Sequence, residues 1–402
     1  MSGRAMDRMG VPSRLNIADP PVCPIPFPMT NALRFLLPFL LASASASFAQ
    51  APAVVVAAPP AEPALAWHRV AQWGVEGRAW PDLDRLRYFD RFPAIAEGRV
   101  TDAVWNLSRD SAGMMVRFKT DATTIWTNYT LYRERLAGAN MTAIGASGID
   151  LYARDSSGKW RWVGVSRPAG KIVRQEVIAG LAPGMREYAA YLPLYNGVDE
   201  ISIGVPPAAH FEQLAPRSEK PIVFYGTSIT HGASASRPGM AHPAILGRRL
   251  DLPVVNLGFS GNGRMDAAVG ELLGKIDAAV YVIDCLPNMD AAMVREKCLP
   301  LVKQLRAARP NTPIVLIEDR RNTNSWILPV RDQHHTANHA ALRESFAALE
   351  KEGVKGLFYL AGDDLMGADA EASTDGSHPS DLGFVRHADL FEPVLRAALG
   401  KK

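Results

Sequence analysis

Polar residues able to take part in acyl transfer stand at places where the strands of a parallel sheet are expected to end. The run PIVFYGTSITHG brings Ser228 directly after an apolar stretch, between two threonines and before Gly232. Later strand ends bring the glycine-rich run NLGFSGNG, then Asn288, and finally the loop that carries Asp375 and His378. A serine, permissive glycines, an amide, an aspartate and a histidine are the groups that acyl transfer requires. The alternative for Ser228 is a serine that only ends a strand in a turn.

The elements that must position these residues follow from the apolar pattern after about residue 220. Helical stretches over 241–250, 265–276, 291–308 and near 384–399 alternate with unbroken apolar runs, which are typical of strands buried on both faces. The apolar runs cover residues 221–226, 253–259, 278–284, 313–319 and 356–361. This alternation predicts an α/β fold with a doubly wound, mostly parallel sheet in a flavodoxin-like three-layer sandwich. In such sheets the reacting groups gather at the carboxyl ends of the strands.

The preceding segment, from about residue 67 to about residue 216, has short strands separated by regular turn signals. Residues 114–120 and 124–131 alternate in polarity, and residues 148–165 and 188–205 each indicate two strands around a turn. The pattern predicts an antiparallel β-sandwich of the jelly-roll kind. Seven of the eight tryptophans lie in this part. Such side chains could face a sugar ring, or they could simply fill the core of the sandwich.

Length and charge limit the remaining classes of protein. A chain of 402 residues is long enough for two domains, and its formal net charge of +3 gives no electrostatic footprint for nucleic acid. We predict an upstream extension over 1–28, a signal peptide over 29–49, a Pro/Ala-rich linker over 50–65, the β-sandwich over 66–216 and the α/β domain over 217–402.

The signal peptide is predicted from the order of its parts. Arg34 supplies positive charge, residues 35–41 are apolar, and Ser47-Phe48-Ala49 is a small-x-small cleavage site before Gln50. The apolar segment is too short to span a bilayer comfortably, and a buried helix is the alternative. We therefore expect a periplasmic or secreted protein with no stable membrane span after cleavage.

Four short sequence blocks in the second half of the chain occur in the same order as the motifs of a known family. GTSIT, NLGFSGNG, LPN and DGSHP resemble the signature blocks of the SGNH (GDSL-like) hydrolase superfamily, over most of residues 220–398. The run ITHGASASRPGMAHPAILGRRL is similar to one branch of that superfamily. GIDLY, residues 148–152, resembles the GxDLY motif of the β-sandwich domain that precedes the hydrolase in that branch.

The resemblance implies a role for each matching residue. Ser228 would be the nucleophile, His378 its general base and later acid, and Asp375 the residue that orients the imidazole. The N–H groups of Ser228 and Gly261 and the side chain of Asn288 would form the oxyanion hole.

One position departs from the pattern of the superfamily, which has aspartate where this chain has Thr227. How the turn at Ser228 is braced therefore stays open. Gly261 could serve only its turn, and Asn288 could cap the following helix.

Other polar residues near the strand ends have two interpretations each. Arg237 could guide a substrate or pair with an acid, and Asp319 and Arg320 could form an ion pair or a pocket wall. The sequence does not decide between these alternatives for any of the three.

A second D-x-x-H run, Asp332 to His335, stands where a helix is expected to begin, so Asp332 should cap or open that helix. His335 and His339 could hold a metal from one helix face, but no acidic third ligand is obvious and we predict no metal site. Cys285 and Cys298 could form a disulfide or stay buried thiols.

Together these features predict an exported serine esterase without a cofactor, which removes short acyl groups, in particular acetyl, from a small-molecule or saccharide ester. An acyltransferase with the same residues and a non-catalytic glycan-binding protein are the alternatives. The oligomeric state does not follow from the sequence.

Overall fold

The computed structural model describes residues 63–401. The segments predicted over 1–28 and 29–49, and most of the linker predicted over 50–65, lie outside the described residues. Residues 61–402 belong to one compact unit. Within the described range, every helix is too short or too polar to span a bilayer.

The C-terminal part is built on one five-stranded sheet in which all strands are parallel. The strand order is β11-β10-β12-β13-β14, so the chain places its second strand on one side of the first and all later strands on the other. The strands are β10 (Ile222–Gly226), β11 (Val254–Gly258), β12 (Val280–Asp284), β13 (Ile314–Ile317) and β14 (Leu357–Leu360). This doubly wound order confirms the predicted fold class, and its switch point lies between β11 and β12, at the end of β10.

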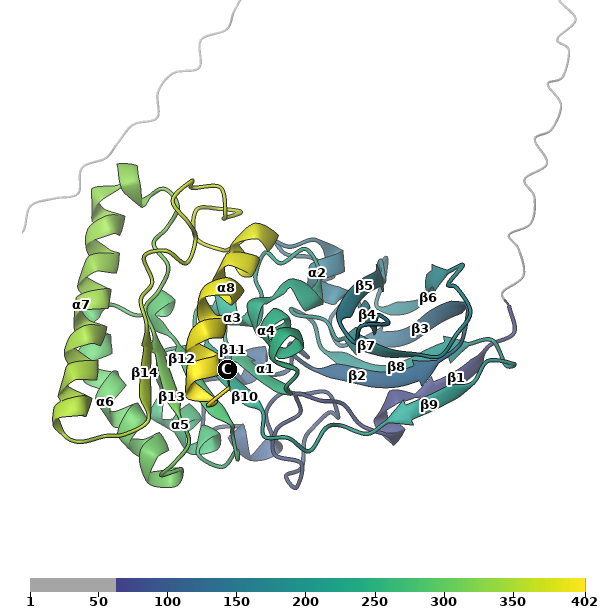
Figure 1. Cartoon of the computed structure of the whole chain (residues 1–402), viewed down its shortest axis with the longest axis horizontal. Helices are drawn as coiled ribbons and strands as arrows, with labels where there is room; N and C mark the ends of the chain where they lie inside the picture. Colours follow the sequence, from purple (N-terminus) through teal and green to yellow (C-terminus); the bar gives the residue numbers. More distant parts are fainter. Residues whose placement is uncertain (1–62, 402) are drawn as a thin grey trace, which may run out of the picture. The chain divides into compact units, whose positions relative to one another are not determined.

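Helices cover both faces of this sheet (Figure 1). Side chains of successive strand residues point to opposite faces, so Val223 and Tyr225 of β10 pack into one buried cluster and Ile222 and Phe224 into another. The first cluster includes α5 (Ala267–Leu273), α6 (Ala291–Ala308) and α7 (Pro329–Lys351). The second includes α4 (His242–Leu250) and α8 (Asp381–Ala398). Burial on both faces explains why these strands are apolar without alternation.

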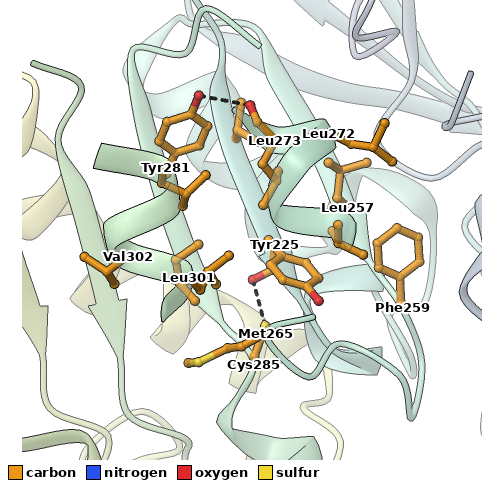
Figure 2. Close-up of a cluster of buried hydrophobic side chains, with 14 of the residues drawn as sticks. Tyr225, Leu257, Phe259, Met265, Leu272, Leu273, Tyr281, Cys285, Leu301 and Val302 are labelled. Atoms are coloured by element: carbon orange, nitrogen blue, oxygen red, sulfur yellow. Dashed lines mark hydrogen bonds between the residues drawn. The ribbon is translucent and has the colours of Figure 1, made fainter. Parts of the chain in front are cut away.

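Figure 2 shows the first cluster, in which Leu272, Leu273, Leu301 and Val302 from the helices cover the aromatic rings of the strands. Cys285 lies there with its thiol 3.6 Å from the carbonyl oxygen of Tyr225. Both Cys285 and Cys298 are buried free thiols. Burial raises the pKa of Cys285 well above its usual range and that of Cys298 to about 12, so both stay protonated.

The N-terminal part consists of two antiparallel sheets around a common core, as predicted. The four-stranded sheet has the order β1-β8-β3-β6 and the five-stranded sheet the order β5-β4-β7-β2-β9. The first sheet is formed by β1 (Ala66–Arg69), β8 (Val198–Val205), β3 (Thr124–Leu131) and β6 (Ile172–Ala179). The second is formed by β5 (Trp160–Val165), β4 (Asp150–Arg154), β7 (Arg186–Tyr191), β2 (Met115–Thr120) and β9 (Phe211–Leu214).

Two short helices, α1 (Asp102–Ser108) and α2 (Ala143–Ser147), lie in the connections of the sandwich. The two strands expected within residues 188–205 are present, but they do not pair with each other. β7 and β8 belong to different sheets, so the turn near Asn196 carries the chain across the core. A hairpin could not do this, because its two strands share one sheet.

The tryptophans of the sandwich part have different surroundings. Trp80 and Trp105 are buried and pack into the core of the α/β part, where Trp80 Nε1 donates to the carbonyl oxygen of Leu272 at 3.0 Å. Trp162 is 51% exposed. Burial accounts for Trp80 and Trp105, and Trp162 is the one whose exposure would allow a ring to stack on it.

Candidate active site

Ser228 lies directly beyond the carboxyl end of β10, as the first residue of the short helix α3 (Ser228–His231). Thr227 is the N-cap of that helix, and its Oγ1 accepts a hydrogen bond from the N–H of Ile229 at 3.3 Å. Ser228 is 8% exposed. The threonine hydroxyl therefore does the capping at the position where the superfamily has an aspartate.

The turn before Ser228 is closely packed against the end of β12 and against the loop that contains Gly263. Thr230 Oγ1 donates to Asp284 Oδ2 at 2.7 Å, which ties α3 to the end of β12. A Cβ on Gly226 would lie 2.1 Å from Thr230 Oγ1, and a Cβ on Gly263 would lie 1.9 Å from the carbonyl oxygen of Gly226. Both positions require glycine because the chain segments approach so closely.

Ser228, His378 and Asp375 form a continuous chain of contacts. Ser228 Oγ lies 2.9 Å from His378 Nε2, and His378 Nδ1 lies 2.7 Å from Asp375 Oδ2. The second oxygen, Asp375 Oδ1, accepts from the N–H groups of Ser377 at 3.0 Å and His378 at 2.8 Å. Partial burial acts to raise the pKa of Asp375, but these hydrogen bonds outweigh it and lower the pKa to about 2. The carboxylate is therefore ionised at neutral pH and can fix the tautomer of the imidazole.

The two further residues predicted for the site lie in loops next to this chain. The N–H of Phe259 donates to the carbonyl oxygen of Gly226 at 2.9 Å, so the loop that contains Gly261 lies against the turn before Ser228. Gly261 has φ +72°, and a Cβ there would meet no atom within 4 Å, so its conformation rather than crowding favours glycine.

Asn288 is held by the same loop. Its Oδ1 accepts from the N–H groups of Asn262 at 3.1 Å and Gly263 at 3.2 Å in the amide orientation that satisfies its surroundings. The Nδ2 group is then left as a donor. Asn288 ends a one-turn 3-10 helix, Leu286–Asn288, and the N-cap of the following helix α6 is Asp290, so Asn288 does not cap that helix.

Asp319 and Arg320 lie behind the loop that carries Asp375 and His378. Arg320 is 5% exposed, its Nε donates to the carbonyl oxygen of Ser377 at 2.9 Å, and its Nη2 donates to Ser377 Oγ. The guanidinium therefore holds Ser377, which lies between Asp375 and His378 in the sequence. Asp319 and Arg320 also border a hollow with Ser377 and His334.

Two histidines of α7, His335 and His339, contact Asp319. His335 Nδ1 lies 2.6 Å from Asp319 Oδ2, and His339 Nε2 lies 2.9 Å from Asp319 Oδ1. Among residues 63–401, no group of three or more His, Cys, Asp or Glu side chains is arranged to hold a metal ion. Asp332 pairs with Arg321 at 2.7 Å and lies in the first turn of α7, whose N-cap is Leu328. Of the two expected roles, Asp332 therefore helps to open the helix and does not cap it.

A pocket of about 510 Å³ lies beside His378, and most of its wall comes from the β-sandwich part. Asn140 Nδ2 lies 3.5 Å from Asp375 Oδ2 and 3.4 Å from His378 Nδ1. Tyr195 Oη donates to the carbonyl oxygen of Ser228 at 3.4 Å. Sequence reasoning missed Asn140 and Tyr195, because no local pattern marks a loop residue that reaches across to another part of the chain.

Comparisons with known proteins identify the family of the chain. Residues 219–396 match the GDSL-like lipase/acylhydrolase family, and residues 65–211 match the GxDLY family, described as the N-terminus of SGNH-hydrolase-type esterases. A protein described as a GDSL-like lipase from Bacteroides ovatus is 31% identical, with a TM-score of 0.80 over 84% of this chain and 99% of that chain. The chain belongs to the GDSL-like hydrolase family.

Two other solved structures share the fold of this GDSL-like hydrolase at lower identity. A salicylyl-acyltransferase from a tetracycline biosynthetic pathway is 19% identical, with a TM-score of 0.63 over 85% of this chain and 96% of that chain. An acetyl xylan esterase from Butyrivibrio proteoclasticus is 10% identical, with a TM-score of 0.50 over 84% and 99%. No curated protein matches the sequence significantly.

In this GDSL-like hydrolase, the aspartate of the GxDLY motif joins the two parts of the chain. Asp150 is buried, and its Oδ2 accepts from the N–H of Gly239 at 2.8 Å, while its Oδ1 accepts from Trp162 Nε1 at 3.0 Å. Arg237 Nε lies 3.5 Å from the same carboxylate. Arg237 thus pairs with an acid, and it does not border the pocket beside His378 in the described chain.

The GDSL-like hydrolase also buries a carboxyl group against α3, the helix that begins at Ser228, and this predicts a pH effect on stability. Burial raises the pKa of Asp284 to about 7, although Thr230 donates to it. The folded state therefore binds a proton that the unfolded chain releases near its ordinary pKa of about 4, so the free energy of unfolding falls as pH rises from about 4 to about 7. Asp284→Asn cannot titrate and should reduce this slope by up to about 1.4 kcal/mol per pH unit in that window.

Urea unfolding at pH 4.5, 5.5, 6.5 and 7.5 measures that slope. Part of the slope should remain in Asp284→Asn, because burial also raises the pKa values of Asp110 and Asp150 to about 6. The exposed Asp277→Asn is the control and should retain the slope of the wild type. Equal slopes in Asp284→Asn and wild type would contradict the assignment.

Proposed function

We propose that this GDSL-like hydrolase is a serine esterase that cleaves short acyl esters, in particular acetyl esters of carbohydrates. The observation that carries the proposal is the contact chain in which Ser228 Oγ lies 2.9 Å from His378 Nε2 and His378 Nδ1 lies 2.7 Å from Asp375 Oδ2. A hydroxyl within hydrogen-bond reach of a base that is itself oriented by a carboxylate has the geometry of an activated nucleophile. Family membership supports the hydrolase class, and the fold is shared with carbohydrate esterases.

In the first half of the reaction, Ser228 Oγ attacks the carbonyl carbon of the ester and its proton passes to His378 Nε2. Asp375 stabilises the imidazolium that forms and holds it in place. The bond between the acyl carbon and the alcohol oxygen then breaks, and His378 returns the proton to that oxygen. The alcohol leaves, and the acyl group stays on Ser228.

In the second half, water attacks the acyl carbon and gives a proton to His378 Nε2. The bond from the acyl carbon to Ser228 Oγ breaks as Oγ regains the proton, and a carboxylic acid is released. In both halves the N–H groups of Ser228 and Gly261 and the Nδ2 of Asn288 would donate to the oxyanion.

The low exposure of Ser228 supports a short acyl group. Because Ser228 is only 8% exposed, a long acyl chain has little room to approach its Oγ. The test uses p-nitrophenyl acetate, butyrate and octanoate, and kcat/KM should fall with chain length. A steep rise with chain length, together with no turnover of any acetylated saccharide, would overturn the substrate class. Added alcohol reveals the alternative acyltransferase, which would form a new ester in preference to acid.

Asn288 provides a prediction for the oxyanion. Asn288→Ala removes the amide donor and should lower kcat by about 10²–10³-fold. Asn288→Asp keeps an oxygen for the N–H groups of Asn262 and Gly263 but has no N–H to donate, so it should lose activity as well. Asn262→Ala, whose amide bonds only to the carbonyl oxygen of Ser260, is the matched control. Full activity in Asn288→Asp would restrict Asn288 to a structural role.

We also propose that the protein is exported to the periplasm or the medium. The sequence from Arg34 to Gln50 supports this, with its charge, apolar stretch and small-x-small site. Mass spectrometry of the protein from the native cell should find a mature N-terminus at Gln50 outside the cytoplasm. An intact leader on cytoplasmic protein would contradict it.

A further inference from the structure

The pocket beside His378 carries more positive than negative charge. Its wall includes Arg133 and Arg135, whereas Asp110 is its one acidic residue in the described chain. Arg133 forms an ion pair with Asp110, and Asp110 is 2% exposed, so these two charges compensate each other at the back of the wall. The positive charge left over is that of Arg135.

Arg135 is prepared to bind an anion. Its Nε donates to the carbonyl oxygen of Ala137 at 2.9 Å, which holds the base of the guanidinium on its own loop. Among residues 63–401, the Arg135 side chain makes no other hydrogen bond and no ion pair, while its carbonyl oxygen accepts from Asn196 Nδ2 at 3.3 Å. Nη1 and Nη2 together present a planar fork, which matches the two oxygens of a carboxylate.

The position of Arg135 relates this charge to the reacting ester. Arg135 and Asn140 lie on the loop that follows β3, and Asn140 is the residue that reaches Asp375 and His378. The same pocket includes Ser260, from the loop that contains Gly261. A volume of about 510 Å³ is within the range of small-molecule sites, so the pocket that Arg135 and His378 both line is large enough for a sugar residue.

We propose that the substrate is an acyl ester of an acidic saccharide, whose carboxylate binds Arg135 while the ester reaches Ser228. This inference rests on the proposed esterase function, because it names the substrate of that same site. Asn106 and Asn140 supply amides for sugar hydroxyls on the same wall. A neutral acetylated sugar would leave the Arg135 fork without a partner.

The test compares the methyl glycosides of glucuronic acid and of glucose, each with one acetyl group on the same ring hydroxyl, so that the two substrates differ only at C6. The wild-type ratio of kcat/KM, acidic over neutral, should exceed 1 and fall towards 1 when NaCl rises from 0.05 to 0.5 M, since salt screens an exposed ion pair. Arg135→Gln should lower this ratio about tenfold or more. Arg167→Gln is the matched control, because it removes an exposed arginine that lies outside the pocket wall. Its ratio should equal that of the wild type.

Binding separates this inference from the proposed function. Calorimetry with methyl glucuronide and methyl glucoside measures affinity without turnover, and the acid should bind more tightly to wild type but not to Arg135→Gln. Equal affinity for the two sugars, or an equal effect of Arg135→Gln and Arg167→Gln, overturns the inference. If acid binding depends on Arg135 but no ester is cleaved, the inferred anion site stands and the proposed esterase fails.

Discussion

Ser228→Ala is expected to lower kcat/KM for p-nitrophenyl acetate by about 10⁴-fold or more. The variant removes the oxygen that lies 2.9 Å from His378 Nε2, and no acyl-enzyme can then form. Loss of the nucleophile costs about as much as loss of the whole triad, because its members act as a unit. His378→Ala should therefore have an effect of similar size, and the double variant should be no worse than either single one.

The control for this prediction is another serine of the same segment. Ser236 bonds to Asp381 through its N–H and its Oγ and has no contact with His378. Ser236→Ala should keep turnover close to that of the wild type. Circular dichroism should give the same spectrum for all these variants, because a lost hydroxyl at an 8% exposed site leaves no large cavity. Retained activity in well-folded Ser228→Ala would sink the proposed mechanism.

Arg91→Ala is expected to lower the free energy of unfolding by about 3–5 kcal/mol. Arg91 is 1% exposed and donates to four carbonyl oxygens. These belong to Leu107, Asp110, Asn256 and Gly258, at 2.7–3.1 Å. Burial lowers the pKa of Arg91 to about 10, so the guanidinium is still charged at neutral pH. The alanine variant would remove a donor from each oxygen, and among the four only that of Leu107 is recorded with another donor outside regular helices and strands, the N–H of Asp110 at 3.1 Å. Leaving buried oxygens unsatisfied costs more than the lost hydrogen bonds themselves.

Two variants make the Arg91 prediction specific. Arg91→Lys keeps the charge but presents one ammonium in place of a planar fork, so it should recover only part of the loss. Arg99→Ala, at an exposed arginine eight residues later, should change stability by less than about 0.5 kcal/mol. Urea unfolding at pH 7 measures all three variants. A loss below about 1 kcal/mol in Arg91→Ala would show that water satisfies the four carbonyl oxygens.

The parallel sheet was the part of the fold most open to prediction from sequence. Each apolar run from PIVFYG onward corresponds to a strand of the sheet, because strands that are buried on both faces consist of unbroken apolar residues. The short edge strands β1 and β9 were missed, since a half-exposed four-residue strand has little pattern of its own. The polar strand β6 was missed as well. The order of the sandwich strands was beyond reach because pairing depends on contacts distant in sequence.

The site also divides into residues that the sequence could locate and residues that it could not. Reacting groups gather at the carboxyl ends of parallel strands, and this rule located five residues of the site. The structure brings these residues into neighbouring loops; they are Ser228, Gly261, Asn288, Asp375 and His378. Their catalytic roles stay predictions. Asn140 and Tyr195 come from loops of the other part, and only the folded chain shows that they approach the same atoms.

The loop that carries Asn140 and Arg135 has a consequence for how such an enzyme diversifies. On the proposed function, chemistry and recognition are encoded in separate stretches of sequence, with Ser228, Asp375 and His378 after residue 220 and most of the pocket wall before residue 200. Insertions and substitutions in an exposed loop of a sandwich are well tolerated. On that proposal, a lineage of such enzymes can exchange one ester for another by altering that loop, while Ser228 and His378 stay the same.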